Sequence, residues 1–200
     1  ERLMQHAHTL NLESKAISEI VIEVARFFIG TPYVGHTLEK DSVEKLVLNL
    51  RELDCTTFME SVMALTLCIK NKKNSFGDYA EMLIKLRYRD GIIDQYPSRL
   101  HYTTDWLINN REKGLIELVE GGFGFSDFFP NINFMSTHPK SYKQLANPAF
   151  VEIMKQHESR ISKERMKYIP KQNLNNTGKI IKDGDIIAIL TNVAGLDFSH

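Results

Sequence analysis

The stretch Leu53-Asp54-Cys55-Thr56-Thr57-Phe58 places the first of the chain's two cysteines at the expected beginning of an amphipathic helix. Asp54 is suited to cap that helix, because an aspartate at this position accepts a hydrogen bond from an unpaired backbone N–H group. The apolar residues that follow predict a helix face packed into a core. These residues are Phe58, Val62, Leu65 and Ile69, with Met59 and Met63 beside them. A helix N-terminus favours a thiolate over a thiol, so Cys55 is a candidate nucleophile. The alternative interpretation is a small buried hydrophobic residue.

A second helix is predicted over residues 13–29. Its apolar face consists of Ile17, Val21, Val24 and Phe28. Gly30 and then Pro32 follow its last turn, and this order is typical of a helix end. Tyr33 comes directly after the proline, and taken as a single residue it is expected to be a turn residue that buries its ring.

The end of the chain predicts a turn and a buried strand. Lys182-Asp183-Gly184-Asp185 has turn composition, and the apolar run Ile186-Ile187-Ala188-Ile189-Leu190 after it predicts a buried strand. Gly195-Leu196-Asp197-Phe198-Ser199-His200 follows.

Three features in this order resemble the NlpC-type cysteine peptidases of bacterial cell walls: Gly30-Thr31-Pro32-Tyr33, the helix that begins at Cys55, and the strand followed by Ser199-His200. The closer resemblance is to the N-acetylmuramoyl-L-alanine amidase-like branch, because residues 50–60 and 99–106 look like its characteristic stretches. The resemblance implies an α+β fold with a papain-like core, in which the cysteine helix packs on a small antiparallel sheet. We expect a single catalytic domain over residues 1–200, with a large helical insertion at about residues 72–175.

The same resemblance assigns the site. It implies that Cys55 is the nucleophile, that His200 is its general base and that Tyr33 lines the active site beside the cysteine. The family's third polar residue normally lies on the strand after the one that His200 begins. We therefore expect the sequence to be a fragment that is incomplete at its C-terminus, and we assign no third catalytic residue.

Four further candidates for substrate binding lie around the start of a helix in the expected insertion, and they are Arg99, His101, Asp105 and Trp106. If the insertion forms a wall of the cleft, Asp105 is suited to hold a cationic amine and Trp106 to pack on a sugar or peptide. The alternative is that Asp105 caps the helix or pairs on a solvent-exposed face, and that Trp106 belongs to the core.

The function implied is cysteine-dependent amide hydrolysis through a thioester acyl-enzyme, with peptidoglycan or a muropeptide as the substrate. The bond cut is either the one between muramic acid and L-alanine or one within the stem peptide. A periplasmic or secreted location in a bacterium is implied as well. Two alternatives remain open: a thiol acyltransferase on the same fold, and a non-catalytic module that binds the cell wall.

Composition limits the other classes of function. Lysine plus arginine and aspartate plus glutamate number 25 each, so the chain has no net charge to attract nucleic acid or an anionic membrane. No apolar run is long enough to predict an integral membrane segment. With no CxxC or HExxH motif, we expect neither a metal nor another cofactor. The stretch Gly121-Gly122-Phe123-Gly124-Phe125-Ser126 lacks the spacing of a phosphate-binding loop.

Other elements follow from periodicity and helix-ending residues. Helices are predicted near residues 76–89, 103–113 and 148–167. Residues 46–51 favour a strand, with a helix as the competing interpretation. Cys68 is expected to be a core residue on the same helix as Cys55, too far along it for a disulfide.

Overall fold

The computed structural model describes residues 2–119 and 124–199, which form two compact units. Unit 1 comprises Glu1–Ile93 and Asp183–Ile186, and unit 2 comprises Asp94–Lys182 and Ile187–His200. Each unit is described by itself. Glu1, residues 120–123 and His200 lie outside the described residues, so the glycine-rich stretch at 121 is described only in part.

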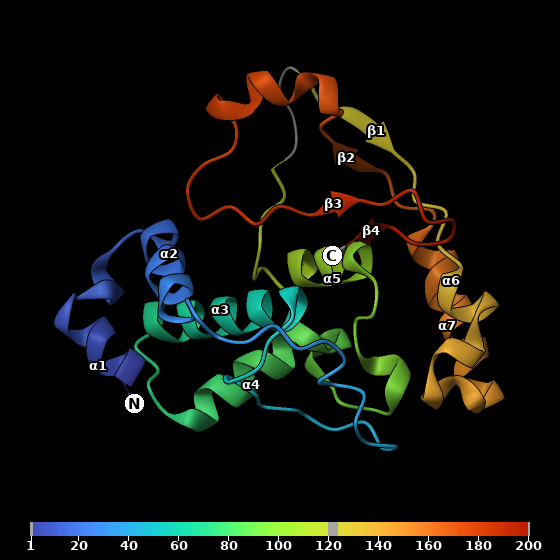
Figure 1. The fold of residues 1–200 in the computed structure, drawn as a ribbon, viewed down its shortest axis with the longest axis horizontal. Coiled ribbons are helices and arrows are strands. Elements are labelled where there is room, and N and C mark those ends of the chain that lie inside the picture. Colours follow the sequence, from blue (N-terminus) through green and yellow to red (C-terminus); the bar gives the residue numbers. More distant parts are fainter. Residues whose placement is uncertain (1, 120–123, 200) are drawn as a thin grey trace. The chain divides into compact units, whose positions relative to one another are not determined.

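Unit 1 is helical. Its helices are α1 (Arg2–Thr9), the 3₁₀ turn Leu12–Ser14, α2 (Ile17–Phe27), α3 (Cys55–Lys70), α4 (Phe76–Arg87) and the 3₁₀ turn Arg89–Gly91. Helix α3 packs against both α2 and α4 (Figure 1). Its middle is buried around almost the whole circumference, which makes it the central helix of the unit. The helix predicted to begin at Cys55 and the helix predicted near residues 76–89 are thus confirmed.

Helix α2 begins later than predicted. Residues 12–14 form a 3₁₀ turn, and Ala16, in an extended conformation, precedes the first helical residue, Ile17. The buried stripe consists of Ile20, Val24 and Phe28, whereas Ile17 is half exposed. Val24 and Phe28 of the predicted face are thus buried, while Ile20 is buried in place of Ile17. The helix ends at Phe27, two residues before the predicted end, and Gly30 beyond it has a left-handed φ of 88°.

Residues 46–51 form neither the predicted strand nor the competing helix. Tertiary contacts hold this irregular region instead. Arg87 Nη1 donates to the carbonyl of Val47 at 2.8 Å, and the Tyr88 hydroxyl donates to the carbonyl of Lys45, which directly precedes this stretch, at 3.1 Å. The backbone here bonds to side chains that follow it by about forty residues, and no local pattern reports such contacts.

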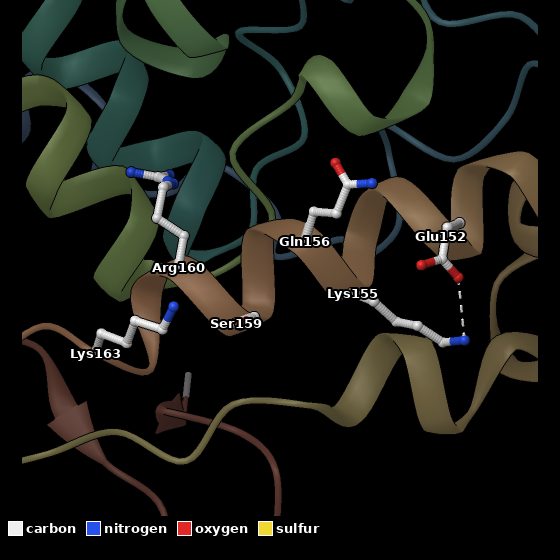
Figure 2. A pocket seen from close by; sticks show the side chains of 6 residues that line it. All are labelled: Glu152, Lys155, Gln156, Ser159, Arg160 and Lys163. Carbon is white, nitrogen blue, oxygen red and sulfur yellow. Dashed lines mark hydrogen bonds and ion pairs between the residues drawn. The ribbon is translucent and has the colours of Figure 1, made fainter.

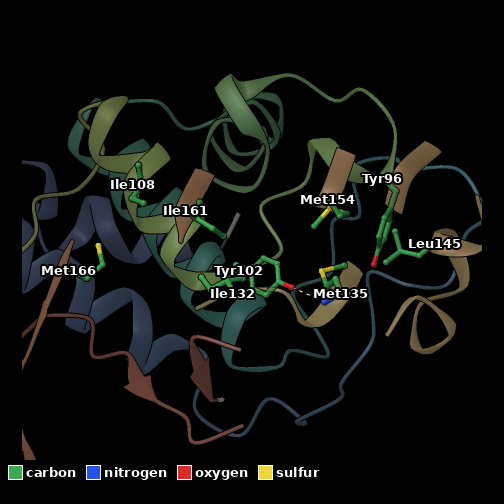
Figure 3. Packing of buried hydrophobic residues seen from close by; sticks show 9 residues of the cluster. All are labelled: Tyr96, Tyr102, Ile108, Ile132, Met135, Leu145, Met154, Ile161 and Met166. Carbon is green, nitrogen blue, oxygen red and sulfur yellow. Dashed lines mark hydrogen bonds between the residues drawn. The ribbon is translucent and has the colours of Figure 1, made fainter. Parts of the chain in front are cut away.

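Unit 2 combines short helices with two small antiparallel sheets. Its α-helices are α5 (Thr103–Glu112), α6 (Phe134–Thr137) and α7 (Pro148–Ile161). Its 3₁₀ segments are Tyr96–Ser98, Pro139–Ser141, Lys143–Ala146 and Lys171–Lys179. Strand β1 (Ser126–Phe128) pairs with β2 (Met166–Tyr168), and β3 (Ile189–Leu190) pairs with β4 (Phe198–Ser199). The core cluster drawn in Figure 3 consists of Tyr96, Tyr102, Ile108, Ile132, Met135, Leu145, Met154, Ile161 and Met166.

Two predictions in unit 2 were wrong. The helix predicted over residues 148–167 ends at Ile161, and Met166–Tyr168 forms strand β2, because pairing with β1 captures that segment. The predicted buried strand over residues 186–190 pairs only at Ile189–Leu190. Ile187 in this run is 65% exposed, so the apolar composition of the run was not sufficient to predict burial. The mixed α+β class is confirmed, while the papain-like core and the single catalytic domain stay predictions.

Candidate active site

Cys55 is the first residue of α3, as predicted, and Asp54 caps that helix. Thr57 N donates to Asp54 Oδ1 at 2.8 Å, and Asp54 N donates to Thr57 Oγ1 at 2.9 Å. This reciprocal capping box fixes where the helix begins. Cys55 is half-buried and lies at the positive end of the helix macrodipole.

Tyr33 lies beside the cysteine. Val34 N donates to the Leu53 carbonyl at 3.0 Å, and Leu53 N donates to the Pro32 carbonyl at 3.1 Å, so the two segments form a parallel bridge. The pKa of the Tyr33 hydroxyl is raised above its ordinary value by the charge of Cys55 first, then by desolvation and by a side-chain hydrogen bond to Cys55. The ring is 72% exposed, so the expectation of a buried turn residue was wrong.

The two cysteines differ in environment. Both are free, and Cys68 is fully buried in α3, as predicted for a core residue. Burial raises the pKa of the Cys68 thiol to about 11. A raised pKa means that the reactive thiolate of Cys68 appears only as the pH rises toward that value.

We expect iodoacetamide to modify Cys55 at least about tenfold faster than Cys68 in the folded protein between pH 7 and 8, because only the thiolate reacts. Mass spectrometry of tryptic peptides after timed quenching measures both rates. In urea the two rates should converge, which controls for intrinsic reactivity. Faster labelling of Cys68 in the folded protein would contradict the assignment of Cys55 as the reactive thiol.

The four candidates between residues 99 and 106 lie in unit 2 and are largely buried. The guanidinium carbon of Arg99 lies 5.1 Å from the centre of the Tyr96 ring, and His101 Nε2 lies 2.9 Å from the Tyr96 carbonyl oxygen. Asp105 is 1% exposed and Trp106 is 3% exposed, both in the first turn of α5. Asp105 Oδ1 accepts a hydrogen bond from Arg160 Nη2 at 2.5 Å. The cation that Asp105 holds in this structure is thus Arg160.

His200, the predicted general base, lies outside the described residues. The chain is described up to Ser199 in β4, the strand predicted to lead into the histidine. The pairing of Cys55 with His200 therefore stays a prediction.

Two buried carboxylates of unit 2 were not singled out by the sequence. Asp197 Oδ2 accepts from Thr104 N at 2.6 Å, and Asp197 Oδ1 accepts from Phe198 N at 2.8 Å. Burial raises the pKa of the Asp197 carboxyl, while these backbone donors lower it. Glu158 Oε1 accepts from the Tyr102 hydroxyl at 2.7 Å and from Ser136 N at 3.0 Å. The only signal in the sequence for Glu158 is its helical spacing from the apolar Met154 and Ile161.

A surface hollow of about 460 Å³ lies along α7 in unit 2, as Figure 2 shows. Its lining residues are Glu152, Lys155, Gln156, Ser159, Arg160 and Lys163. All six belong to α7 or directly follow it, and Lys155 pairs with Glu152 at 3.2 Å. Among the described residues, no cluster of histidine, cysteine and acidic side chains is arranged to hold a metal ion. The described helices also include none with the length and apolar character needed to cross a bilayer.

The fold and the site define a helix-rich α+β protein with a half-buried thiol at a helix N-terminus. The chain belongs to the N-acetylmuramoyl-L-alanine amidase-like family, whose model (AmiA-like) matches residues 23–200. None of the curated proteins compared with the chain matches it.

Solved structures resemble the chain closely. An N-acetylmuramoyl-L-alanine amidase from Bacteroides uniformis is 45% identical, with a TM-score of 0.86 over 92% of this chain and 78% of that one. A Bacteroides fragilis protein named provisionally as a xylanase is 44% identical, with a TM-score of 0.82 over 88% of this chain and 78% of that one. The Legionella pneumophila protein LPG0564 is 21% identical, with a TM-score of 0.62 over 100% of this chain and 77% of that one, and shares the fold.

Proposed function

We propose that this protein hydrolyses an amide bond of bacterial peptidoglycan through Cys55. The observation that carries the proposal is the half-buried Cys55 thiol at the capped start of α3, with the Tyr33 hydroxyl at its side. Membership of an amidase-like family and 45% identity to a Bacteroides uniformis N-acetylmuramoyl-L-alanine amidase support the substrate class. Peptidoglycan lies outside the cytoplasmic membrane, so we propose that the protein acts in the periplasm or after secretion.

In the proposed mechanism the Cys55 thiolate attacks the amide carbonyl, and His200 donates a proton to the departing amine. The C–N bond breaks and a thioester forms. A water molecule then attacks the thioester, with His200 taking the proton from the water, and the carboxylic acid leaves as the thiol is regenerated. The pairing of Cys55 with His200 is supported by the family resemblance and by the chemistry of the two groups.

Two donors near Cys55 are suited to stabilise the negative oxygen of the tetrahedral intermediate. The backbone N–H of Cys55 belongs to the first turn of α3, where backbone N–H groups have no partner within the helix. The Tyr33 hydroxyl is the second, because it lies beside Cys55 and a tyrosine hydroxyl can donate a hydrogen bond.

The bond between the lactoyl group of muramic acid and L-alanine is our preferred cleavage site, since the similar Bacteroides uniformis protein is an amidase of that name. A bond within the stem peptide is the alternative. The buried side chains of Asp105 and Trp106 suit a supporting function at the start of α5. Direct contact of Arg99, His101, Asp105 or Trp106 with the substrate remains a prediction.

Glycoside hydrolysis, suggested by the name of the Bacteroides fragilis protein, receives less support. That reaction needs two carboxyl groups facing the sugar. The buried carboxylates of unit 2 are bonded to other groups: Asp105 to Arg160, Glu158 to Tyr102, and Asp197 to backbone N–H groups.

Digestion of purified sacculi tests the proposal, with soluble products analysed by mass spectrometry. We expect stem peptides with a free L-alanine amino group, and no product from Cys55→Ala. Cys68→Ala is the matched control and should retain activity, because Cys68 is buried away from solvent. New amino groups at inner stem residues would indicate the endopeptidase alternative, and shortened glycan chains would overturn the amidase proposal.

The same digestion separates the two rival classes. A thiol acyltransferase should give a product that contains an added amine in place of water. A cell-wall-binding module should sediment with sacculi and release nothing, in the wild type as well as in Cys55→Ala.

A further inference from the structure

The segment Gly195–Ser199, which leads into His200, is held by unit 2 at three separate places. The first anchor is Gly195, whose carbonyl accepts hydrogen bonds from Asn133 N at 3.1 Å and Phe134 N at 3.0 Å, at the start of α6. Gly195 has a φ of 81°, and a side chain there would collide with the Asn133 amide oxygen. Glycine is therefore required at the position where the segment turns.

The second anchor is Asp197, which is 3% exposed. Its two carboxylate oxygens have different partners: Oδ2 accepts from Thr104 N at 2.6 Å, and Oδ1 accepts from Phe198 N at 2.8 Å. Thr104 belongs to the first turn of α5, where unpaired N–H groups and the helix dipole favour a negative charge. One oxygen thus attaches the segment to α5, while the other fixes the direction in which the backbone leaves Asp197.

The third anchor is the β3–β4 ladder, in which Phe198 pairs with Leu190 and Ser199 pairs with Ile189. Thr191 N also donates to the Asp197 carbonyl at 3.2 Å. A two-residue strand provides little stability by itself. The direction of the chain at Ser199 therefore depends on Asp197 as well as on the ladder.

We propose that Asp197 is a positioning residue for His200, because its two-oxygen attachment to α5 and to Phe198 N fixes the backbone that leads into the histidine. The inference rests on the proposed function, in which His200 acts on Cys55. It assigns no contact between Asp197 and the substrate.

The two acceptor oxygens of the Asp197 carboxylate suggest substitutions that test the proposal. Asparagine retains one acceptor oxygen at the same side-chain length and serine retains a shorter acceptor, so Asp197→Asn and Asp197→Ser should fold. Each retains one acceptor group where the carboxylate has two, and asparagine directs an N–H group at a backbone donor. Glu158→Gln is the matched control, because it changes another buried carboxylate of unit 2 whose Oε1 alone accepts both bonds, which glutamine can preserve.

The experiment measures the rate of Cys55 alkylation by iodoacetamide against pH, together with kcat and KM on a muropeptide, in the full chain. A histidine that stabilises the thiolate maintains alkylation at low pH, so His200→Ala should shift the profile to higher pH. We expect Asp197→Asn and Asp197→Ser to shift it in the same direction, with alkylation at pH 6 and kcat each about tenfold lower and KM nearly unchanged. Glu158→Gln should match the wild type.

The double variant Asp197→Asn with His200→Ala isolates the positioning effect. We expect its alkylation profile to equal that of His200→Ala alone, because Asp197 then has no histidine to position. A wild-type profile and kcat in the Asp197 variants, beside a shifted profile in His200→Ala, would overturn this inference and leave the proposed function intact. An unshifted profile in His200→Ala would overturn the proposed pairing and this inference with it.

Discussion

Replacement of Cys55 by alanine should lower kcat on peptidoglycan by at least about 10⁴-fold, and replacement of His200 by alanine should have an effect of similar size. The reason is that the two side chains work as one unit. Without the sulfur no thioester forms, and without the imidazole the thiolate is less populated and the departing amine receives no proton. The double variant should be about as inactive as either single variant, since groups that act together do not contribute additively.

The measurement is initial-rate release of stem peptides from a defined muropeptide, with the thermal unfolding midpoint of each variant as the folding control. Cys68→Ala serves as the matched control, since it removes the other thiol. Losses that multiply in the double variant would show that His200 and Cys55 act independently. Wild-type kcat in Cys55→Ala would exclude the thioester mechanism.

Replacement of Arg87 by methionine should lower the free energy of unfolding by about 3–5 kcal/mol, the cost of leaving a buried charge without its partner. Arg87 Nε donates to Glu60 Oε2 at 2.7 Å, and the two side chains are 3% and 2% exposed. The substitution leaves the Glu60 carboxylate buried between α3 and α4 and also removes the donor to the Val47 carbonyl. Urea unfolding followed by circular dichroism measures the change.

Two controls distinguish a buried pair from a surface one. Adding Glu60→Met to Arg87→Met should recover most of the loss, because the uncompensated charge is then gone. Lys155→Met breaks a pair whose side chains are 54% and 63% exposed, so its effect should stay below about 1 kcal/mol. Equal losses in Lys155→Met and Arg87→Met would contradict the argument from burial.

Local sequence signals located the elements around the thiol. Asp54 and Thr57 lie three residues apart in the sequence, so the capping box and the start of α3 follow from a few adjacent residues. The turn after α2 also follows from local sequence, because Gly30 adopts the left-handed conformation at little cost. The resemblance that rested on these segments agrees with the family to which the chain belongs.

Features that depend on residues distant in the sequence could not be predicted in the same way. Met166–Tyr168 was predicted to continue a helix, but it pairs with β1 as a strand. The carbonyls of Lys45 and Val47 bond to Tyr88 and Arg87, which come much later in the sequence. Trp106 and Asp105 suited a binding site by residue type. Their burial, and the pairing of Asp105 with Arg160 on α7, depend on how two helices pack.

The sequence by itself determined the helix that begins at Cys55, the left-handed Gly30 just after α2, the core position of Cys68 and the family resemblance, because each depends on neighbouring residues or on motif order. Only the tertiary structure decided that Tyr33 is exposed, that Asp105 is paired with Arg160 and that Asp197 attaches β4 to α5. The physical reason is that hydrogen bonding and burial depend on distance in space. Segments far apart in the sequence come within that distance only when the chain folds.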